Sequence, residues 1–398
     1  MNDSLHKPND NQNFALLNLG FRPFFILAGV FGVLGMAYWG LVVHGVMGVD
    51  PGPLTLYQWH AHEMIFGYAL AVIGGFLLTS VKTWTGLQTP SGAGLLVLAV
   101  LWLAARLAFA LGGAGILVGA LLNLAFVGAF AAIIGDRVLR VKQWRQLGIL
   151  GVVGLLALGE FVLIFGIIQR DQWLIGKVLY LALYLVLLMI LIMARRVVPA
   201  FTERGVGYPC TLGQSKILDA LALWGFVLYA LTSVFLTSPV TTALIAGATF
   251  IAHSLRLWNW YTPGIWKRPL LWSLHLSLAA IAASLLLAAL APWLKISSYL
   301  VLHGFAVGGL GLITLSMMSR VALGHTGRDI HNPPGLVSLA LVLMVAAALI
   351  RALFPLLLPG NISLWLALSQ LAWIAAFAIF LGIYTGILVK PRVDGAPG

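Results

Sequence analysis

Long apolar stretches alternate with short polar connections along almost the whole chain. A membrane-spanning helix needs about 20 mostly apolar residues, each adding about 1.5 Å of length. Twelve stretches meet that requirement, near residues 23–46, 57–80, 93–111, 114–134, 146–168, 172–194, 217–236, 239–258, 269–290, 296–320, 335–355 and 362–388. The pattern predicts an all-α fold, a polytopic membrane helix bundle with about twelve transmembrane helices.

The polar segments between and beyond these stretches are too short to form a further domain. We expect a short cytoplasmic N-terminal segment over residues 1–22, a single transmembrane helical domain over 23–390 and a cytoplasmic tail over 391–398. The N-terminal segment lacks a basic stretch that runs into a short apolar core with a cleavage site, so we expect no signal peptide.

The composition excludes an ordinary soluble domain. Of the 398 residues, 61% are hydrophobic and only 9% are charged, and the mean hydropathy is +1.01. Soluble domains carry roughly one quarter charged residues. The chain is therefore expected to contact membrane lipid over most of its surface.

The distribution of basic residues predicts an orientation. The formal charge of +12 could indicate a nucleic-acid partner, but eighteen of the 23 Lys and Arg residues fall at one set of alternating connections. The opposite connections keep only Arg170 and Lys295. This asymmetry is the positive-inside signature, and it predicts that both termini are cytoplasmic. The charge thus indicates topology, and no nucleic-acid partner is expected.

The chain has one cysteine, Cys210. An intramolecular disulfide is therefore impossible, and metal sites that need several thiolates are excluded. Any bound metal must use histidine, methionine, carboxylate or an external ligand.

Six histidines in or beside predicted spans form two groups at opposite depths. The outer group is His60, His62 and His303, and the inner group is His253, His275 and His325. Ionisable groups inside a membrane are costly, so they indicate function by default. Histidines near helix ends are more often interfacial hydrogen-bonding residues, and we interpret His6, His44 and His331 in that way.

His60 and His62 are separated by about 200° around a helix, because a helix has about 3.6 residues per turn. They therefore point to opposite sides, and we do not expect them to share one ion unless the start of the helix is distorted. We therefore expect one of them to be a metal ligand and the other to orient a ligand, contact a haem propionate or move protons. His62 and His303 are each followed, at equal offsets, by a glycine and a Thr-Gly pair, a weak sign of an internal repeat.

Neutral imidazole is a ligand for haem iron, copper and zinc. Zinc sites favour closely spaced ligands such as HExxH, and no such pattern occurs. Histidines on well-separated helices favour a haem. His253 and His275 come from adjacent spans at similar depth, as a haem with two histidine ligands needs, and His325 is a third candidate. Pairing of Met64 with His60 suits copper, although methionine in a membrane helix more often serves packing.

Other charged residues lie within the spans. Glu63 and Glu160 lie near the outer histidines and are candidate proton donors. Five arginines could hold haem propionates, because guanidinium binds carboxylate in a bidentate way. They are Arg106 and Arg351 on the outer side and Arg22, Arg256 and Arg320 on the inner side. The alternative is that the outer arginines form ion pairs with the two glutamates, and the sequence alone does not discriminate.

Four segments carry a resemblance to a known family. "LGFRPFFILAGVFG" at 19–32, "WHAHEMIFGYALAVIGGFLLTSVKTWTG" at 59–86, "LWLAARLAF" at 101–109 and "LHGFAVGGLGLITLSMMSRVALGHTGR" at 302–328 resemble the NnrS family. The resemblance runs over nearly the whole chain, and its HAHEM and GHTGR blocks are specific. It implies a multi-pass protein of the bacterial inner (cytoplasmic) membrane, containing haem and copper and linked to nitric oxide metabolism and nitrosative stress. The residues in the family's motifs are His60, His62, Glu63, His303 and His325.

The leading hypothesis is a haem-binding inner-membrane protein of nitric oxide metabolism or nitrosative stress resistance. Its enzymatic form is a quinol-linked nitric oxide reductase with one or two haems, expected to be b-type, near both leaflets. The alternatives are a non-enzymatic protein that binds nitric oxide or metal, a transporter, and a quinone-linked electron-transfer protein. Known nitric oxide reductases and haem-copper oxidases use an adjacent histidine pair, which this chain lacks, so we do not assign their fold.

Overall fold

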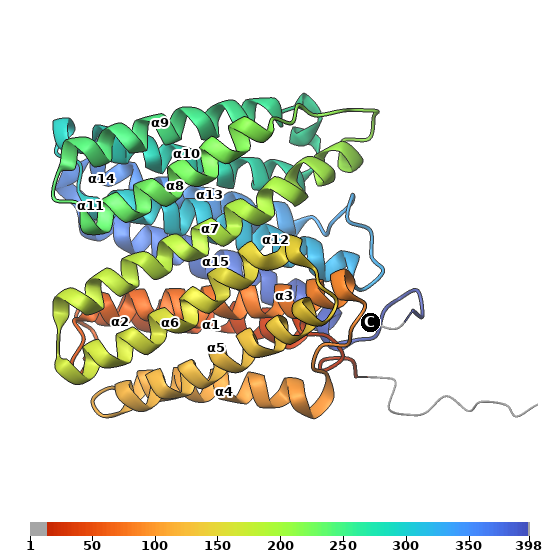
Figure 1. Ribbon diagram of the computed structural model, residues 1–398, viewed down its shortest axis with the longest axis horizontal. Helices are drawn as coiled ribbons and strands as arrows, with labels where there is room; N and C mark the ends of the chain where they lie inside the picture. The colour runs from red at the N-terminus through yellow and green to blue at the C-terminus, as the bar shows by residue number, and fades with distance from the viewer. Residues whose placement is uncertain (1–13, 397–398) are drawn as a thin grey trace, which may run out of the picture.

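Helices make up nearly all of the computed structural model, which describes residues 14–396 (Figure 1). Within these residues twelve helical spans are long and apolar enough to cross a membrane, which confirms the predicted all-α membrane bundle. Most of the predicted N-terminal segment, residues 1–13, and the last two residues of the tail lie outside the described part. Because each span is helical, its backbone hydrogen bonds are satisfied within the span, as lipid requires.

The spans and the short helices between them have the following bounds. They are α1 (Phe21–Val43), α2 (Leu56–His62) with η2 (Glu63–Ala69) and α3 (Leu70–Thr85), α4 (Gly92–Leu111), α5 (Gly115–Arg140), η3 (Trp144–Gln146) with α6 (Leu147–Gln169), α7 (Gln172–Gly205), α8 (Lys216–Phe235), α9 (Pro239–Asn259), η4 (Pro263–Lys267), α10 (Pro269–Leu294), α11 (Ser298–His303) with η5 (Gly304–Gly311) and α12 (Leu312–Gly324), α13 (Leu336–Ala352) with α14 (Phe354–Leu357), and η6 (Pro359–Asn361) with α15 (Ile362–Val389).

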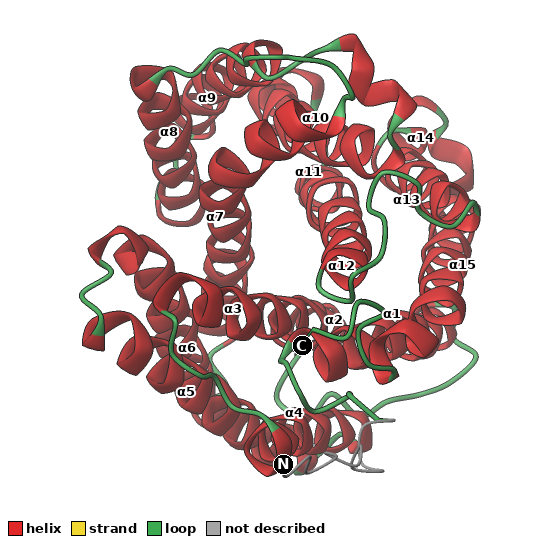
Figure 2. Ribbon diagram, turned by 90° about the vertical axis from the view of Figure 1, so that its right-hand side faces the viewer, coloured by secondary structure: helices red, strands yellow, loops and turns green. Residues whose placement is uncertain are grey.

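The twelve spans pack as three arcs of four. The first arc runs through α4, α5, α6 and α7, and the second through α8, α9, α10 and α12. The third joins the two ends of the chain, because α13 packs on α15, α15 on α1, and α1 on α3. Seen along the bundle axis, the arcs surround a centre formed by α3, α7 and α12 (Figure 2). Each arc therefore ends on one central span.

The central spans are the most buried ones. In the apolar window of the α2–η2–α3 span 83% of residues are buried, and the α11–η5–α12 span follows with 72%. Both contain a wide π-helical turn, η2 and η5, that begins directly after a histidine, His62 or His303. π-Helical turns are rare and often lie at functional sites. The equal offsets seen in the sequence thus correspond to one structural feature that occurs twice.

Glycines let η5 approach its neighbours closely. A Cβ atom on Gly308 would lie 2.7 Å from Cβ of Ala280 in α10, and one on Gly311 would lie 2.4 Å from the Trp373 ring in α15. Small residues allow close helix packing in membranes, where van der Waals contact replaces the hydrophobic effect between helices. The glycines therefore let the α11–η5–α12 span pack closely on α10 of its own arc and on α15 of the third arc.

Both ends of the described chain lie at the same end of the bundle (Figure 1). The Ala15 amide donates to the Val389 carbonyl at 2.8 Å, and Arg22 donates to the carbonyls of Leu388 and Lys390 at 2.8 and 2.7 Å. Arg22 thus caps the last turn of α15, where helix carbonyls lack partners. Following the predicted orientation, we name this the inner end and the opposite end the outer end.

Candidate functional site

Two histidines, His60 and His303, lie close together at the outer end, and we call them the outer histidine pair. His60 lies in α2 and His303 is the last residue of α11. Thr55 begins α2 with a capping box, in which the Thr55 hydroxyl accepts from the Gln58 amide and the Gln58 side chain accepts from the Thr55 amide. The ring of Tyr57, one turn before His60, lies 6.0 Å from that of Tyr299, one turn before His303, and Arg351 contacts His303. Residues from α2, α11 and α13 thus come together.

The ring of His303 is oriented by a partner at each nitrogen. Nδ1 donates to the Tyr299 carbonyl, one turn earlier, at 2.7 Å. Nε2 accepts from Nη2 of Arg351 at 3.3 Å. This is a neutral tautomer with its lone pair on Nε2. Metal-ligating histidines typically donate their other nitrogen to a carbonyl or carboxylate, so His303 has the orientation of a ligand.

The ring of His60 is held by stacking instead. It lies parallel to the indole of Trp39 in α1, with centroids 4.3 Å apart and planes within 8°. Within residues 14–396 no hydrogen bond to this ring is found. Its nitrogens are therefore available to a ligand, and its position depends on fewer contacts than that of His303.

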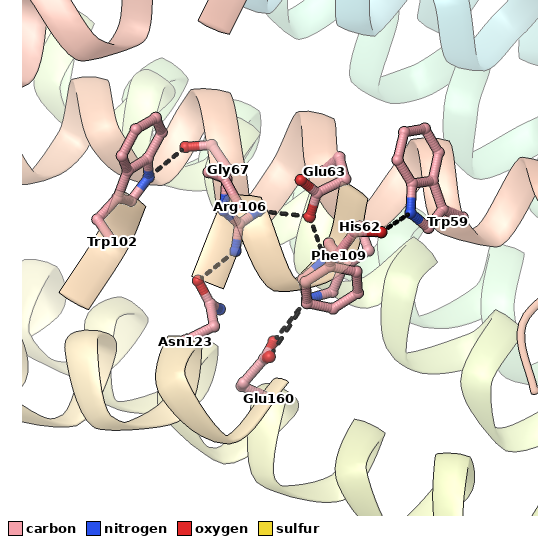
Figure 3. Close-up of polar contacts among 9 residues, drawn as sticks. All are labelled: Trp59, His62, Glu63, Gly67, Trp102, Arg106, Phe109, Asn123 and Glu160. Atoms are coloured by element: carbon pink, nitrogen blue, oxygen red, sulfur yellow. Dashed lines mark hydrogen bonds and ion pairs between the residues drawn. The ribbon is translucent and has the colours of Figure 1, made fainter. Parts of the chain in front are cut away.

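A second group of polar residues lies beside the pair and is shown in Figure 3. His62 is completely buried, with Nδ1 3.0 Å from Glu63 Oε1 and Nε2 3.2 Å from Glu160 Oε1. Arg106 forms an ion pair of 2.5 Å with Glu63 and donates to Asn123 Oδ1 at 2.9 Å. We call these five residues the His62 network.

The charges of the His62 network balance when His62 carries a proton. Both ring nitrogens of His62 face carboxylate oxygens, and only the imidazolium form can donate at both. Two carboxylates, Glu63 and Glu160, then face two cations, His62 and Arg106. A buried group of charges is tolerated when it is paired in this way. In this arrangement His62 has no lone pair for a metal, in contrast to His60.

The His62 network depends on close packing around it. The His62 ring stacks on Phe109 with centroids 4.1 Å apart. A Cβ atom on Gly67 would lie 2.7 Å from Nη1 of Arg106. Glycine at this position therefore leaves room for the guanidinium to reach Glu63, and the Gly67 carbonyl accepts from Trp102 Nε1 at 3.0 Å.

The inner histidines have other partners. His253 Nε2 donates to the Ala222 carbonyl at 3.1 Å, and its Nδ1 accepts from Arg256 at 3.1 Å. The two nitrogens of His275 lie 3.0 and 3.1 Å from the carbonyls of Leu271 and Trp260. Both nitrogens of His275 therefore face protein oxygens, and this conformation offers a metal no lone pair there. His253 has the same arrangement as His303, with one nitrogen on a carbonyl and the other facing an arginine, so the inner haem stays a prediction.

The candidate arginines also have local partners. Arg106 belongs to the His62 network, so the ion-pair alternative describes it, while Arg351 contacts His303. Arg256 lies 4.0 Å from Asp219 and stacks on the Trp260 ring. The Arg320 guanidinium lies 4.0 Å from the centre of the Phe201 ring. Arg351 is thus the candidate arginine that lies beside a histidine pair.

His325 directly follows α12 at the inner end. Its ring lies 5.6 Å from that of Phe21. Burial, together with the positive charges of Arg392 and Arg22, lowers the pKa of His325 below its usual value. The ring is therefore held neutral in the folded protein more strongly than in the unfolded chain.

We expect His325 to make the free energy of unfolding decrease as the pH is lowered. Below about pH 6.5 the unfolded chain binds a proton at His325 that the folded protein resists, so acid favours unfolding. In His325→Asn the loss of stability between pH 7.5 and 5 should be smaller, as measured by denaturant unfolding at each pH. His331→Asn, a change of an exposed histidine in the following loop, is the control. Equal pH slopes for all three proteins would contradict the assignment.

Copper and Met64 receive less support. Met64 is partly buried and packs against the hydrophobic core. Among the residues that the structure describes, no group of three or more His, Cys, Asp or Glu side chains is placed to hold a metal ion. The outer histidine pair supplies two such groups, which suits an iron already held by a porphyrin. Copper stays a prediction of the resemblance.

Sequence reasoning missed three residues of the site. Trp39 stacks on His60, the Tyr299 carbonyl orients His303, and Asn123 accepts from Arg106. Asn123 carried a usable signal, since it is a polar residue in the middle of an apolar span. Trp39 and Tyr299 carried none, because aromatic residues are common near the ends of membrane helices.

Comparison with known protein families finds a match over nearly the whole chain. A family model described as NnrS protein matches residues 15–392, nearly the whole chain. No curated protein matches the chain. The match covers every span and both parts of the site, so the outer histidine pair and the His62 network lie within the shared sequence.

Proposed function

The chain belongs to the NnrS family, whose members are membrane proteins linked to the nitric oxide response, and from this premise we propose that it binds haem at the outer histidine pair and acts on nitric oxide there. The observation that carries the proposal is the geometry of His60 and His303. They come from two central spans, lie close together, and differ in how firmly they are held. We place the protein in the bacterial inner membrane.

The residues present fit a haem. His303 presents Nε2 on a ring whose other nitrogen is anchored, and the nitrogens of His60 are available. Arg351, which now donates to His303, is a partly buried cation that suits a propionate. When bound, haem supplies an iron that binds nitric oxide and exchanges single electrons. The residues that would hold it are thus His60, His303 and Arg351.

The two histidines are expected to play different parts. His303 is fixed by the Tyr299 carbonyl, whereas His60 is held by stacking on Trp39. We propose that His303 would be the firmly held ligand of the group and His60 the more weakly held one, so that nitric oxide would compete with His60. Nitric oxide is small and apolar, so it can reach this depth through the membrane without a polar channel.

The His62 network favours a second candidate function, the reduction of nitric oxide. Reduction of two molecules to nitrous oxide and water consumes two protons and two electrons. Glu63 and Glu160 are buried carboxylates, and His62, two residues after His60, joins them by hydrogen bonds. They could store and deliver the protons, while a quinol would supply the electrons.

An anaerobic optical spectrum of the purified protein tests the proposal. We expect a haem spectrum typical of two histidine ligands that changes when nitric oxide is added. Protein without haem would overturn the proposal. A haem spectrum that nitric oxide leaves unchanged would overturn the binding of nitric oxide and support electron transfer alone. Release of nitrous oxide from quinol and nitric oxide would separate the reductase from a protein that only binds the gas.

A further inference from the structure

A cavity of about 690 Å³ lies in the outer half of the bundle, apart from the outer histidine pair and the His62 network. Its walls come from α7, α8, α9, α10 and α11. Among the lining residues are Lys177, Tyr180 and Tyr184 of α7 and Tyr229 and Ser233 of α8. We call it the tyrosine cavity. Sites for small molecules typically have about 300–1,000 Å³ and a mostly apolar wall with a few polar groups.

The tyrosine cavity exists because small residues face large ones across it. On α7, Gly176, Tyr180 and Tyr184 are spaced four residues apart and so share one face. On α10 the wall is formed by Pro292 and by two small residues, Ala288 and Ala291. Methyl groups at these two positions leave the space that larger side chains would fill.

Hydroxyl groups converge inside the cavity. The rings of Tyr184 and Tyr229 lie 5.6 Å apart, centroid to centroid, and the side chains of Ser233, Tyr180 and Ser298 line the same cavity. A hydroxyl can both donate and accept a hydrogen bond. At the outer part of the cavity the Lys177 ammonium lies 3.7 Å from the centre of the Trp173 ring. Most of the polar groups thus come from α7 and α8, Thr242 of α9 and Ser298 of α11 add further hydroxyls, and much of the remaining wall is apolar.

We propose that the tyrosine cavity binds the head group of a membrane quinol and of the corresponding quinone. The head group is a flat ring that carries hydroxyls when reduced and carbonyls when oxidised. Its partners must accept from the first form and donate to the second, which Tyr184, Tyr229 and Ser233 can all do. A ligand that enters at this depth must also dissolve in the membrane, as quinols do.

The position of the cavity suits an electron donor to the proposed haem. Val301 and Leu302 line the cavity, and His303 follows them in the chain. Phe305, two residues further, contacts the rings of Tyr184 and Tyr229 at 6.3 and 6.0 Å. A quinol in the cavity would therefore lie within about one helical turn of His303. This inference rests on the proposed function for its purpose, but the binding itself does not require haem.

Binding of decylubiquinone to the purified full-length protein in nanodiscs tests the inference. We expect saturable quenching of tryptophan fluorescence, and decylbenzene, which has the same tail and no oxygens, should not compete. Tyr184→Phe should raise the Kd by roughly three- to tenfold, since one hydrogen bond contributes about 0.5–1.5 kcal/mol. Ala291→Phe should lower the affinity further by filling the space.

Matched variants make the result specific. Ala283→Phe adds the same ring to the lipid-exposed face of α10, and Tyr384→Phe removes a hydroxyl from α15; both should bind as the wild type does. Unchanged affinity in Tyr184→Phe and Ala291→Phe, or competition by decylbenzene, would overturn the inference. Quinone binding by protein that lacks haem would overturn the proposed function and leave the cavity assignment supported. Haem without quinone binding would overturn the cavity assignment and leave the proposed function supported.

Discussion

His303→Ala is expected to leave the purified protein almost without haem. The variant removes the ligand whose ring is anchored by the Tyr299 carbonyl and leaves Arg351 without its partner. Haem occupancy should fall by at least about tenfold, because a loss of 1.4 kcal/mol in binding already has that effect. The measurement is haem content per protein together with the optical spectrum.

His60→Ala should behave differently from His303→Ala. Because stacking on Trp39 is the contact that holds His60, we expect this variant to keep part of its haem, with a spectrum typical of one histidine ligand. Nitric oxide should bind to it faster than to the wild type, since no ligand has to move aside. Equal haem loss in both variants would contradict the division of roles.

His275→Ala is the control for a site at the inner end. Its ring nitrogens face backbone carbonyls, so the variant should keep the haem content of the wild type. Loss of haem in His275→Ala and retention in His303→Ala would show that the assignment to the outer histidine pair is wrong. Loss of part of the haem in each would support a second haem near the inner leaflet.

Arg106→Met is expected to lower the free energy of unfolding by roughly 3–5 kcal/mol, the usual cost of removing one partner of a buried ion pair. The variant leaves His62 alone with two carboxylates, Glu63 and Glu160, and removes the donor to Asn123. Reversible unfolding in mixed detergent micelles measures the effect. Arg140→Met, which changes an exposed arginine paired with Asp136, should have little effect because solvent screens such pairs.

A double variant shows whether the His62 network acts as a unit. In Arg106→Met with Glu63→Gln the remaining charges, His62 and Glu160, balance again. The double variant should therefore lose less stability than the sum of the two single variants, as expected for residues in contact. Strict additivity would mean that the ion pair between Arg106 and Glu63 is not coupled to His62.

Part of the site could be predicted from periodicity alone. His60 and His62 are two residues apart in a helix, which predicts that they face different ways. In the structure His60 faces Trp39 and His303, and His62 faces Glu160. The two histidines accordingly have different partners. The sequence could not tell which one keeps its nitrogens available.

The choice between the two interpretations of the arginines required the fold. Arg106 and Arg351 have similar depths in their spans, and both could be matched with a propionate or a carboxylate. Arg106 lies against Glu63, whereas Arg351 lies against His303. The difference arises from the arcs. Arg106 lies in α4 of the first arc, which also contains Glu160, whereas Arg351 lies in α13 of the third arc.

The sequence by itself determined the twelve spans, the depth of each polar residue and the angular separation of neighbours within one helix. These properties depend on the length of apolar stretches, the rise per residue and the helical period, all of which are local. Only the tertiary structure decided which spans meet, and thereby joined His60 to His303 and His62 to Glu160. The partners lie 243 and 98 positions apart in the chain, and lipid-facing and helix-facing positions are similarly apolar in a membrane protein. Hydrophobic patterning therefore cannot report the lateral arrangement that creates the site.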